Sequence, residues 1–483
     1  MVQERTSKRA WIAGLTSFVL HLVGLLSLAV WTVGVGIGLS GHSISVNTGD
    51  GLESEIESFE IGNEIAEASE ASESLESNPS LAVSPTQLQR ITESAIEPEL
   101  EVPGDTSSAS GLMQQAEMAT SVGGLGMMPS LSFDGRSKEN RGRLALENGG
   151  SAESERAVEM ALEYLAAHQL NDGSWSMLYH ASCEELCEPS CTGRDPYRYA
   201  ATGLALLCFL GAGKTVEDEV HGNVVSKGIY FLQQTLRTNS SAGYWVGPEA
   251  AAQMYEHGIA TLALCEAYGM MQSAELKDTC QLAIEFIVQA QFRDGGWDYH
   301  PKSPGDLSIV GWQAMALKSA TASKLIVPID TIRGIDRFLE RSRAGDFLFK
   351  YRTQKPTKSM TAIGVLMQIF RGQSKDARSI ERGIEYLARE GPSNTDLYYN
   401  YYATQAMFHM GGAHWKKWNY NMRDYLIGTQ VQNGHAKGSW YFDGDPSNKA
   451  AGRFYTTCMA CLILEVYYRY LPVYSEREEK FQF

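Results

Sequence analysis

From about residue 151 to residue 474 the chain repeats one pattern of polar and apolar positions. An amphipathic stretch leads through a short loop, with a glycine and an aromatic residue, into a stretch that is almost wholly apolar. The unit can be written out six times, and its loop aromatics are Trp175, Trp245, Trp297, Phe349, Tyr398 and Trp440. Recurrence of one supersecondary unit at this length is typical of repeat architectures. The pattern predicts an all-α fold of six helical hairpins.

The two stretches of each predicted hairpin differ in how completely they are buried. In the first stretch apolar residues recur at helical spacing, as at Val158 and Leu162, so one face is buried and the other faces water. The second stretch is apolar all round, which predicts an inner layer. The last inner stretch, TCMACLILEVYYRYL, needs an apolar partner, and this favours a closed α/α toroid over an open superhelix. Gly173, Gly295 and Gly434 are predicted to end three outer helices.

An uncharged run at residues 11–39 follows the first ten residues, which include three basic ones before the run. It is long enough to cross the ~30 Å hydrocarbon core of a bilayer, which takes about 20 helical residues. Basic residues before the run and acidic residues after it predict a single-pass anchor, with residues 1–10 in the cytoplasm and the toroid in the periplasm. The alternative is a cleaved signal peptide, whose apolar region is usually only ~7–15 residues long.

Residues 40–150 are rich in serine, glutamate, glycine and proline. Between residues 40 and 101 there are fourteen acidic residues and a single basic one, Arg90. Such a segment buries too little apolar surface to offset the entropy of ordering, which predicts a disordered acidic linker. Most of the formal net charge of −16 lies there, so the remainder lacks the basic stripe of a nucleic-acid-binding protein. We therefore expect no nucleic-acid partner. A charged tail is expected at residues 475–483.

Two loops resemble a known motif. The segments QLNDGSW, ending at Trp175, and QFRDGGW, ending at Trp297, resemble the QW motif of the prenyltransferase and squalene oxidase repeat superfamily. Longer segments, such as GGWDYHPKSPGDLSIVGWQAMALKS, are similar to membrane-anchored, squalene-cyclase-like repeat proteins of planctomycete-type bacteria. The resemblance covers about residues 128–474 and the anchor-and-linker layout. It implies an α/α toroid with a central cavity, and it leaves the activity open because that fold hosts several chemistries.

Each chemistry that the resemblance suggests lacks a residue it needs. The cyclases protonate an alkene with an Asp-x-Asp-Asp motif, and here Asp306 matches only the first position, with Ser308 and Ile309 in place of the other carboxylates. A lone aspartate is ionised near neutral pH. The prenyltransferases hold zinc with Asp, Cys and His, and no histidine lies beside Cys458 in FYTTC. The thioester motif is absent too. Asp443 and Asp445 are expected in a solvated turn or an ion-binding loop.

The remaining candidates lie at the starts of the predicted inner helices. His257, Glu256, Asp306 and Asp396 are the candidate catalytic residues. The residues predicted to line a ligand cavity are Tyr255, Trp312, Tyr398, Tyr399, Tyr402, Arg453 and Tyr455. A histidine beside a carboxylate can act as a general base, or it can simply bond within a helix bundle. For the aromatic residues, helical spacing alone favours a core position. Arg453 could form a buried ion pair with Asp306 or Asp396.

The cysteines fall into two sets. Five lie in apolar helical stretches, where a thiol usually behaves as a small hydrophobe: Cys208, Cys265, Cys280, Cys458 and Cys461. Cys183, Cys187 and Cys191 are spaced by four residues in one loop, and His180 lies three residues before the first of them. An oxidising compartment favours a structural disulfide there, while a metal site with His180 is the second interpretation. No other cofactor is expected.

These observations predict an intact toroid without the known catalytic motifs. The leading hypothesis is a membrane-tethered, extracytoplasmic protein that binds a hydrophobic, isoprenoid-like ligand or a protein partner. The alternative is a divergent terpenoid cyclase, of the squalene-hopene type, that acts on a polyisoprenoid with Asp306, His257 or Asp396 as the acid. A third possibility is a glycan-acting enzyme with Glu256 and Asp396 as paired carboxylates.

Overall fold

The computed structural model of the chain describes residues 133–178, 188, 192–194, 196–246, 253–352 and 355–474. All of them belong to one compact unit. The predicted anchor, the tail and the loop with His180, Cys183, Cys187 and Cys191 lie outside the described residues. Within the described ranges, no helix is both long enough and apolar enough to span a bilayer.

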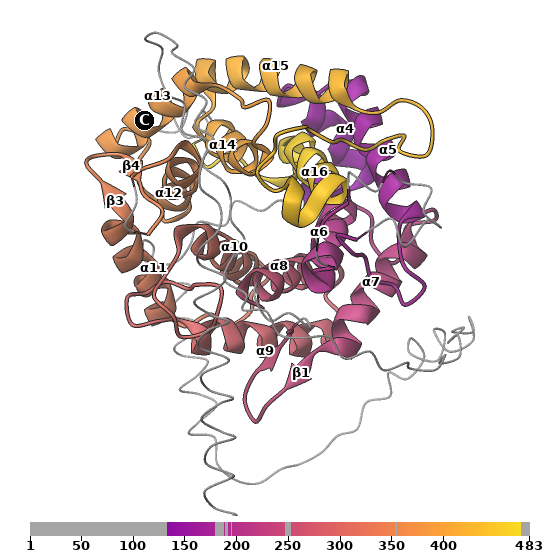
Figure 1. Cartoon of the computed structure of the whole chain (residues 1–483), viewed down its shortest axis with the longest axis horizontal. Coiled ribbons are helices and arrows are strands. Elements are labelled where there is room, and N and C mark those ends of the chain that lie inside the picture. The colour runs from indigo at the N-terminus through magenta and orange to yellow at the C-terminus, as the bar shows by residue number, and fades with distance from the viewer. Residues whose placement is uncertain are drawn as a thin grey trace, which may run out of the picture. The chain divides into compact units, whose positions relative to one another are not determined.

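Outer and inner helices alternate along the chain (Figure 1). The outer helices are α5 (Ala152–Ala167), α7 (Gly222–Thr235), α9 (Ala274–Ala290), α11 (Ile329–Ser342), α13 (Arg378–Glu390) and α15 (Gly412–Thr429). The inner helices are α6 (Arg198–Gly211), α8 (Gln253–Met271), α10 (Leu307–Ala322), α12 (Lys358–Phe370), α14 (Leu397–Met410) and α16 (Asn448–Leu464). The predicted all-α class is confirmed. The inner helices are buried almost along their whole length, and the outer helices bury one face.

The inner helices form a closed ring. Each contacts the next along the chain, and α16 contacts α6, the first of them. On the outside, α15 likewise contacts α5. The last inner helix therefore finds its apolar partner in the first, which is the toroidal arrangement rather than an open superhelix. Two short antiparallel ribbons lie in the loops: β1 (Arg237–Thr238) with β2 (Gly243–Tyr244), and β3 (Arg343–Ala344) with β4 (Leu348–Phe349).

A glutamine side chain at the end of three outer helices ties each to the following outer helix. Each amide donates one bond within its own loop and one to a carbonyl of the next outer helix. These second bonds run from Gln169 to Val224, from Gln291 to Thr331 and from Gln430 to Ala157, at 2.8 to 3.0 Å. The third bond joins α15 to α5, so the bond that links neighbouring repeats also closes the ring.

The loop tryptophans fix the end of their own outer helix. The indole N–H of Trp175 donates to the Leu165 carbonyl at 2.7 Å, and that of Trp297 donates to the Ile287 carbonyl at 2.8 Å. Both rings are fully buried. Since the last carbonyls of a helix have no partner within the helix, these bonds satisfy groups that would otherwise be left unpaired.

The loop glycines do not end the helices as predicted. The outer helix α9 ends at Ala290, and Gly295 lies five residues later with φ +93°. A Cβ at Gly295 would lie 1.9 Å from the Gly334 carbonyl oxygen on α11. The glycine is therefore needed for both its backbone conformation and its close approach to the next repeat. In the loop after α15, Gly438 rather than Gly434 makes this approach, toward Met160 of α5.

We expect Gly295→Ala to lower the free energy of unfolding by about 2 kcal/mol, because strain and a backbone clash add together. Gly345→Ala is the matched control, since Gly345 also has a positive φ, +75°, but a Cβ there would meet nothing within 4 Å. Gly345→Ala should lower the free energy of unfolding by only about 1 kcal/mol, which is the cost of the left-handed backbone alone. Urea unfolding of the full-length protein in mild detergent measures both. Equal losses in the two variants would contradict a role for the contact with α11.

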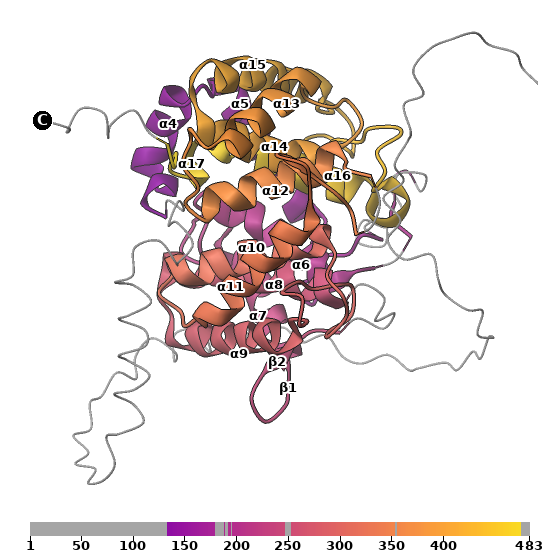
Figure 2. The same ribbon diagram turned by 90° about the vertical axis from the view of Figure 1, so that its left-hand side faces the viewer.

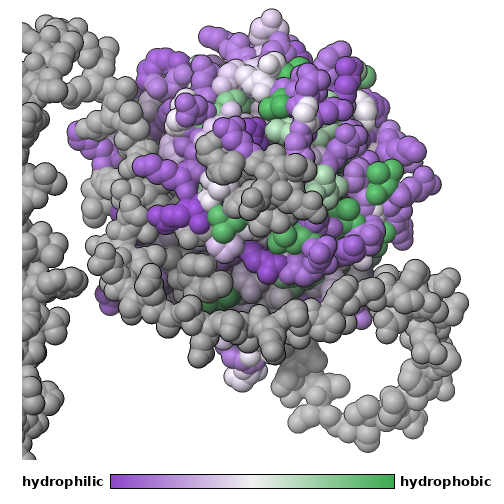
Figure 3. All heavy atoms as spheres, turned by 45° about the vertical axis from the view of Figure 1, so that its right-hand side comes forward, coloured by the Kyte–Doolittle hydropathy of each residue, from purple (hydrophilic) through white to green (hydrophobic). Residues whose placement is uncertain are grey.

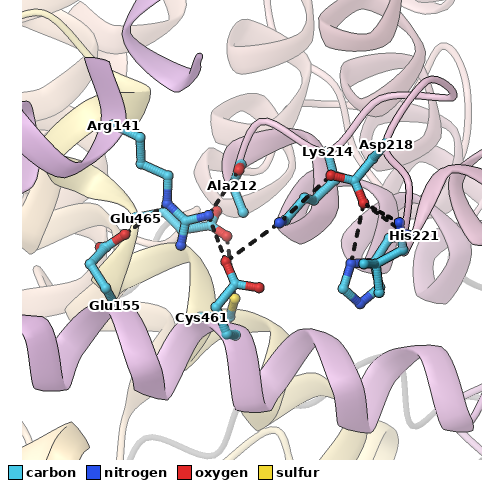
Figure 4. Close-up of polar contacts among 10 residues, drawn as sticks. Arg141, Glu155, Ala212, Lys214, Asp218, His221, Cys461 and Glu465 are labelled. Atoms are coloured by element: carbon cyan, nitrogen blue, oxygen red, sulfur yellow. Dashed lines mark hydrogen bonds and ion pairs between the residues drawn. The ribbon is translucent and has the colours of Figure 1, made fainter. Parts of the chain in front are cut away.

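The predicted linker extends too far at its C-terminal end. The segment η1 (Asp134–Arg136) and α4 (Lys138–Glu147) is helical and packs against α17 (Val466–Arg469), as Figure 2 shows. Arg141 of α4 bonds to Glu155 at 2.7 Å, to Glu159 at 2.8 Å and to the Ala212 carbonyl at 3.0 Å (Figure 4). This segment is ordered by partners far away in the sequence, which its composition could not reveal.

Candidate functional site

The N-terminal ends of the inner helices gather most of the candidate residues. Asp306 is the N-cap of α10, and Asp396 is the N-cap of α14. Tyr255 lies near the start of α8 and Tyr398 near the start of α14. Because neighbouring inner helices begin at the same end of the ring, side chains near these starts meet one another.

Asp306 is the centre of a buried hydrogen-bond network. Its Oδ1 accepts bonds from the Ser308 amide at 2.9 Å and from the Ser308 hydroxyl at 2.7 Å. Its Oδ2 lies 3.2 Å from Nε of Arg352, whose Nη2 also lies 2.6 Å from Asp298. The side chain of Asp306 is fully buried, and Arg352 is partly exposed. The ion pair predicted for Arg453 is therefore made by Arg352, which approaches from the loop after β4.

The surroundings of Asp306 act on its acidity in opposite directions. Burial raises the pKa of Asp306, while hydrogen bonds from Ser308 and Tyr351 and the charge of Arg352 oppose that rise. The Tyr255 hydroxyl donates to the Ser308 hydroxyl at 2.7 Å, which extends the chain of donors toward the carboxylate. Burial also raises the pKa of Tyr255, so its proton stays in place. Burial outweighs these contacts, so the pKa of Asp306 lies above its usual value even though both carboxylate oxygens have partners.

Glu256 and His257 point to different neighbours. Glu256 accepts a bond from the Tyr199 amide at 3.0 Å, at the start of α6. His257 is fully buried, and its Nε2 lies 2.9 Å from the Ala283 carbonyl of α9. Burial lowers the pKa of His257 to about 4, so it is neutral at physiological pH. The structure therefore places His257 between the two layers, where it bonds within the bundle and does not join Glu256 in an acid–base pair.

Asp396 and Asp445 share the N-terminus of α14. The Tyr399 amide donates to Asp396 Oδ1 at 2.8 Å, and the Leu397 amide donates to Asp445 Oδ2 at 3.0 Å. Burial raises the pKa of Asp445 to about 6, and the nearby charge of Asp396 adds to this rise. Burial also raises the pKa of Asp396. The solvated turn expected at Asp445 is wrong, because only 4% of this residue is exposed.

Several predicted cavity residues pack against one another inside the ring. The ring centroids of Tyr398 and Tyr402 lie 5.1 Å apart, and those of Trp312 and Tyr402 lie 6.1 Å apart. The Tyr398 hydroxyl donates to the Ser308 carbonyl at 3.1 Å. Tyr455 is close enough to Tyr398 to raise its pKa, after the larger effect of burial. These aromatic residues form an aromatic core beside Asp306.

Two predicted cavity residues lie elsewhere. The Tyr399 hydroxyl donates to the Gly391 carbonyl at 3.1 Å, and its ring packs against Trp418 of the outer helix α15. Tyr399 therefore faces the outer layer, because it lies one residue beyond Tyr398 and a helix turns by about 100° per residue. Arg453 donates to the Ser439 hydroxyl at 3.2 Å and lies over the ring of Tyr441.

No group of three or more metal-ligating side chains occurs among the described residues. The loop with His180, Cys183, Cys187 and Cys191 lies outside them, so its disulfide or metal site stays a prediction. The five helical cysteines are buried thiols, as their apolar surroundings predicted.

Sequence reasoning missed Tyr299, Tyr351 and Arg352, and it placed Asp445 in a solvated turn or an ion-binding loop. The first two share a position in the repeat, because each follows its loop aromatic, Trp297 or Phe349, by two residues. Their hydroxyls lie 3.5 Å apart, and the side chain of Tyr351 in turn bonds to Asp306. Comparing equivalent positions of successive repeats would have found this pair of tyrosines. Arg352 follows Tyr351 directly, but its partners are 46 and 54 residues away, so no local pattern indicates them.

The comparisons with known proteins find similarity to this chain in structure but not in sequence. No protein-family model and no curated sequence matches the chain. Solved structures that are similar include an alpha-amylase from Clostridium perfringens (11% identity, TM-score 0.47, covering 65% of this chain and 98% of that one). A variant of the type II terpene cyclase MstE from Scytonema shows 14% identity and a TM-score of 0.44 over 65% and 97% of the two chains. The GH76A alpha-1,6-mannanase from Salegentibacter shows 9% identity and a TM-score of 0.44 over 65% and 98%. These likenesses assign neither family nor activity.

Proposed function

We propose that the protein is an α/α toroid of six helical hairpins that is anchored in the cytoplasmic membrane and binds a hydrophobic, isoprenoid-like ligand or a protein partner outside the cytoplasm. The binding region is the N-terminal end of the inner ring, around Asp306 and the aromatic core of Tyr255, Trp312, Tyr398, Tyr402 and Tyr455. The anchor and the linker are proposed from the charge pattern of the sequence.

The observation that carries this proposal is the use of the candidate acids as structural acceptors. Asp306 and Asp396 cap α10 and α14, and Glu256 accepts the Tyr199 amide of the neighbouring inner helix. The helix N-terminus favours the anionic form of a capping carboxylate, although burial leaves the pKa of both aspartates above its usual value. An acid that protonates an alkene must instead hold its proton. Asp306, paired with Arg352, is poorly suited to that step, so we propose that the toroid does not cyclise a terpenoid.

A second function is favoured by one specific observation, the pair Asp396 and Asp445. Two carboxyls that share one helix N-terminus, each with a raised pKa, can hold one proton between them. Such a pair could act as a general acid and base, in a divergent terpenoid cyclase or a glycan-acting enzyme. Glu256 is not the partner of Asp396 in either case, since it bonds to the start of α6.

One experiment separates the two functions. Full-length protein is purified in mild detergent, its bound lipids are extracted and identified by mass spectrometry, and the protein is incubated with squalene. We expect an isoprenoid lipid to copurify with the wild type, Asp306→Asn and Asp445→Asn, and none of the three to convert squalene above a protein-free blank. Asparagine keeps an acceptor oxygen for the capped amides, so both variants should fold. Squalene turnover that is lost in either variant would establish the enzyme. Extracts without isoprenoid would overturn the lipid ligand.

The polarity of the outer surface is consistent with a domain that is exposed to water. Figure 3 shows mainly hydrophilic residues on the described part of one face, with apolar residues scattered among them. The exposed large apolar residues come from different elements: Leu146, Val216, Val220, Tyr230, Ile326, Tyr420 and Leu471. Scattered apolar residues of this kind are normal on a soluble domain.

A further inference from the structure

Three cysteines meet where the ring closes. Cys208 lies on α6, the first inner helix, and Cys458 and Cys461 lie on α16, the last. Residues three apart share one face of a helix, so both thiols of α16 can face the same neighbour. The two helices are in contact, and all three cysteines are fully buried. This seam, between α6 and α16, is where the two ends of the repeat array join.

The contacts at the seam favour one pair of thiols. The Cys208 thiol lies 3.5 Å from the Cys458 carbonyl oxygen, and it interacts with the thiols of both Cys458 and Cys461. The Cys461 thiol interacts with Cys208 too, but it also donates to Glu465 Oε1 at 3.3 Å, a bond that a disulfide at Cys461 would break. Figure 4 shows Cys461 and Glu465 together, near Arg141. A bond from Cys208 to Cys458 would leave the contact between Cys461 and Glu465 intact, so Cys458 is the favoured partner.

Small side chains surround these cysteines on α6. Ala201 and Ala205 lie on the same helix as Cys208, at spacings of seven and three residues, and both are fully buried. Small residues at a helix contact allow backbones to approach closely, and a disulfide requires Cα atoms within about 7 Å. The sequence at the seam is thus compatible with a covalent bond between the helices.

We propose that Cys208 and Cys458 form a disulfide across the seam when the chain folds in an oxidising compartment, while Cys461 stays a thiol bonded to Glu465. The proposal rests on the extracytoplasmic placement in the proposed function. The oxidant is a disulfide of a thiol–disulfide oxidoreductase or of a small thiol. A cysteine thiolate attacks that disulfide and releases one thiol; the second cysteine then attacks the mixed disulfide and releases the other. Two thiols of the chain lose two electrons and two protons, and one external disulfide gains them.

The timing of this reaction follows from burial. Oxidants reach a thiol only where it is exposed, and the closed ring covers both. The bond must therefore form before α16 has fully docked on α6. It would join residues 250 positions apart and so link the first inner helix covalently to the last. Closing so long a loop restricts the unfolded chain strongly.

Cys265 and Cys280 provide an internal comparison. Their thiols also interact, but they lie on α8 and α9, which are consecutive in the chain. A bond between them would close a short segment and would not join the ends of the array. Replacing both by alanine leaves the seam thiols as the remaining helical cysteines and simplifies the peptide map.

To test this, full-length protein is refolded from urea in glutathione buffers of defined redox poise and is then alkylated and analysed by peptide mapping. We expect a Cys208–Cys458 linked peptide under oxidising conditions and an unfolding midpoint about 1 M urea higher than for the reduced protein. Cys461→Ala is the matched control and should keep both effects. Cys208→Ala and Cys458→Ala should lose both. Alkylation of Cys208 and Cys458 after oxidative refolding, or a bridge to Cys461, would overturn the proposal.

The same mapping on protein purified from cells distinguishes this inference from the proposed function. A bridge that forms in the refolding assay and is also present in cell-derived protein agrees with both. A bridge that forms in the refolding assay but is absent from cell-derived protein would refute the extracytoplasmic placement and leave the chemistry of the seam intact.

Discussion

Replacing Glu266 by glutamine is expected to lower the free energy of unfolding by about 3–5 kcal/mol, because it removes the carboxylate that pairs with two buried arginines. Glu266 of α8 lies between Arg136 of η1 and Arg469 of α17, with both N–O distances at 2.8 Å. All three side chains are fully buried. Burial acts to raise the pKa of Glu266, but the two arginines outweigh it and hold that pKa below its usual value.

The measurement is urea unfolding of the full-length protein at pH 7. Asp330→Asn is the control, because Asp330 also pairs with an arginine, Arg333, but is 86% exposed, so its loss should cost less than about 1 kcal/mol. A similar small loss in Glu266→Gln would show that the ion triad does not hold the N-terminal segment on the ring. The triad also has a pH signature: its stabilisation is present above the ordinary pKa of glutamate and is lost as the pH falls through the lowered one.

The triad illustrates what the sequence could not predict about the fold. Helical spacing predicted the two layers, since apolar periodicity depends only on neighbours in the chain. The segment around Arg136 was placed in the linker, because its ordering depends on Glu266, which lies 130 residues away. Gly173, Gly295 and Gly434 were predicted to end outer helices, but they lie in the loops beyond the helix ends, and the contact of Gly295 with the next repeat was not predicted. Long-range partners, rather than local propensity, account for these differences.

The candidate site, like the fold, could be predicted from the sequence only in part. The starts of the inner helices were found because apolar runs begin there, and the structure shows Asp306 and Asp396 as the N-caps of two of them. Their roles could not be read from type and spacing alone: Arg352, not Arg453, pairs with Asp306, and Asp445 bonds to the Leu397 amide, beside Asp396, from a loop 48 residues beyond Leu397. The turn FDGDPSN looked solvated because its composition is polar, yet packing against the start of α14 buries its second aspartate.

Close to the ion triad, Lys318→Met is expected to stabilise the protein by about 3 kcal/mol at pH 7, because a buried amine without a hydrogen-bond partner is costly. Nζ of Lys318 on α10 makes no hydrogen bond with any residue that the structure describes, and only 1% of the residue is exposed. It lies 4.1 Å from the centre of the Phe370 ring, a cation–π contact that offsets part of the cost of burial. Methionine has a similar length and flexibility and can occupy the same space.

The pH dependence gives this prediction a second readout. Burial lowers the pKa of Lys318 to about 7, with Arg469 and Arg136 acting in the same direction and Glu266 opposing them. Between about pH 7 and 10.5 the unfolded chain keeps the lysine proton and the folded protein has lost it, so the stability of the wild type should rise with pH over this range. The gain from Lys318→Met should therefore be largest at or below pH 7 and should shrink toward pH 10.5.

Unfolding curves of the full-length wild type and Lys318→Met at several pH values measure this difference directly, so that groups titrating in both proteins cancel. Lys277→Met is the control: Lys277 is exposed on α9, and its replacement should change stability by less than about 0.5 kcal/mol at every pH. A constant difference between Lys318→Met and wild type from pH 7 to 10.5 would contradict a neutral buried amine. Since Lys318 interacts with Glu266, adding Lys318→Met to Glu266→Gln should recover part of the lost stability by removing a buried amine beside the two arginines that have lost this carboxylate.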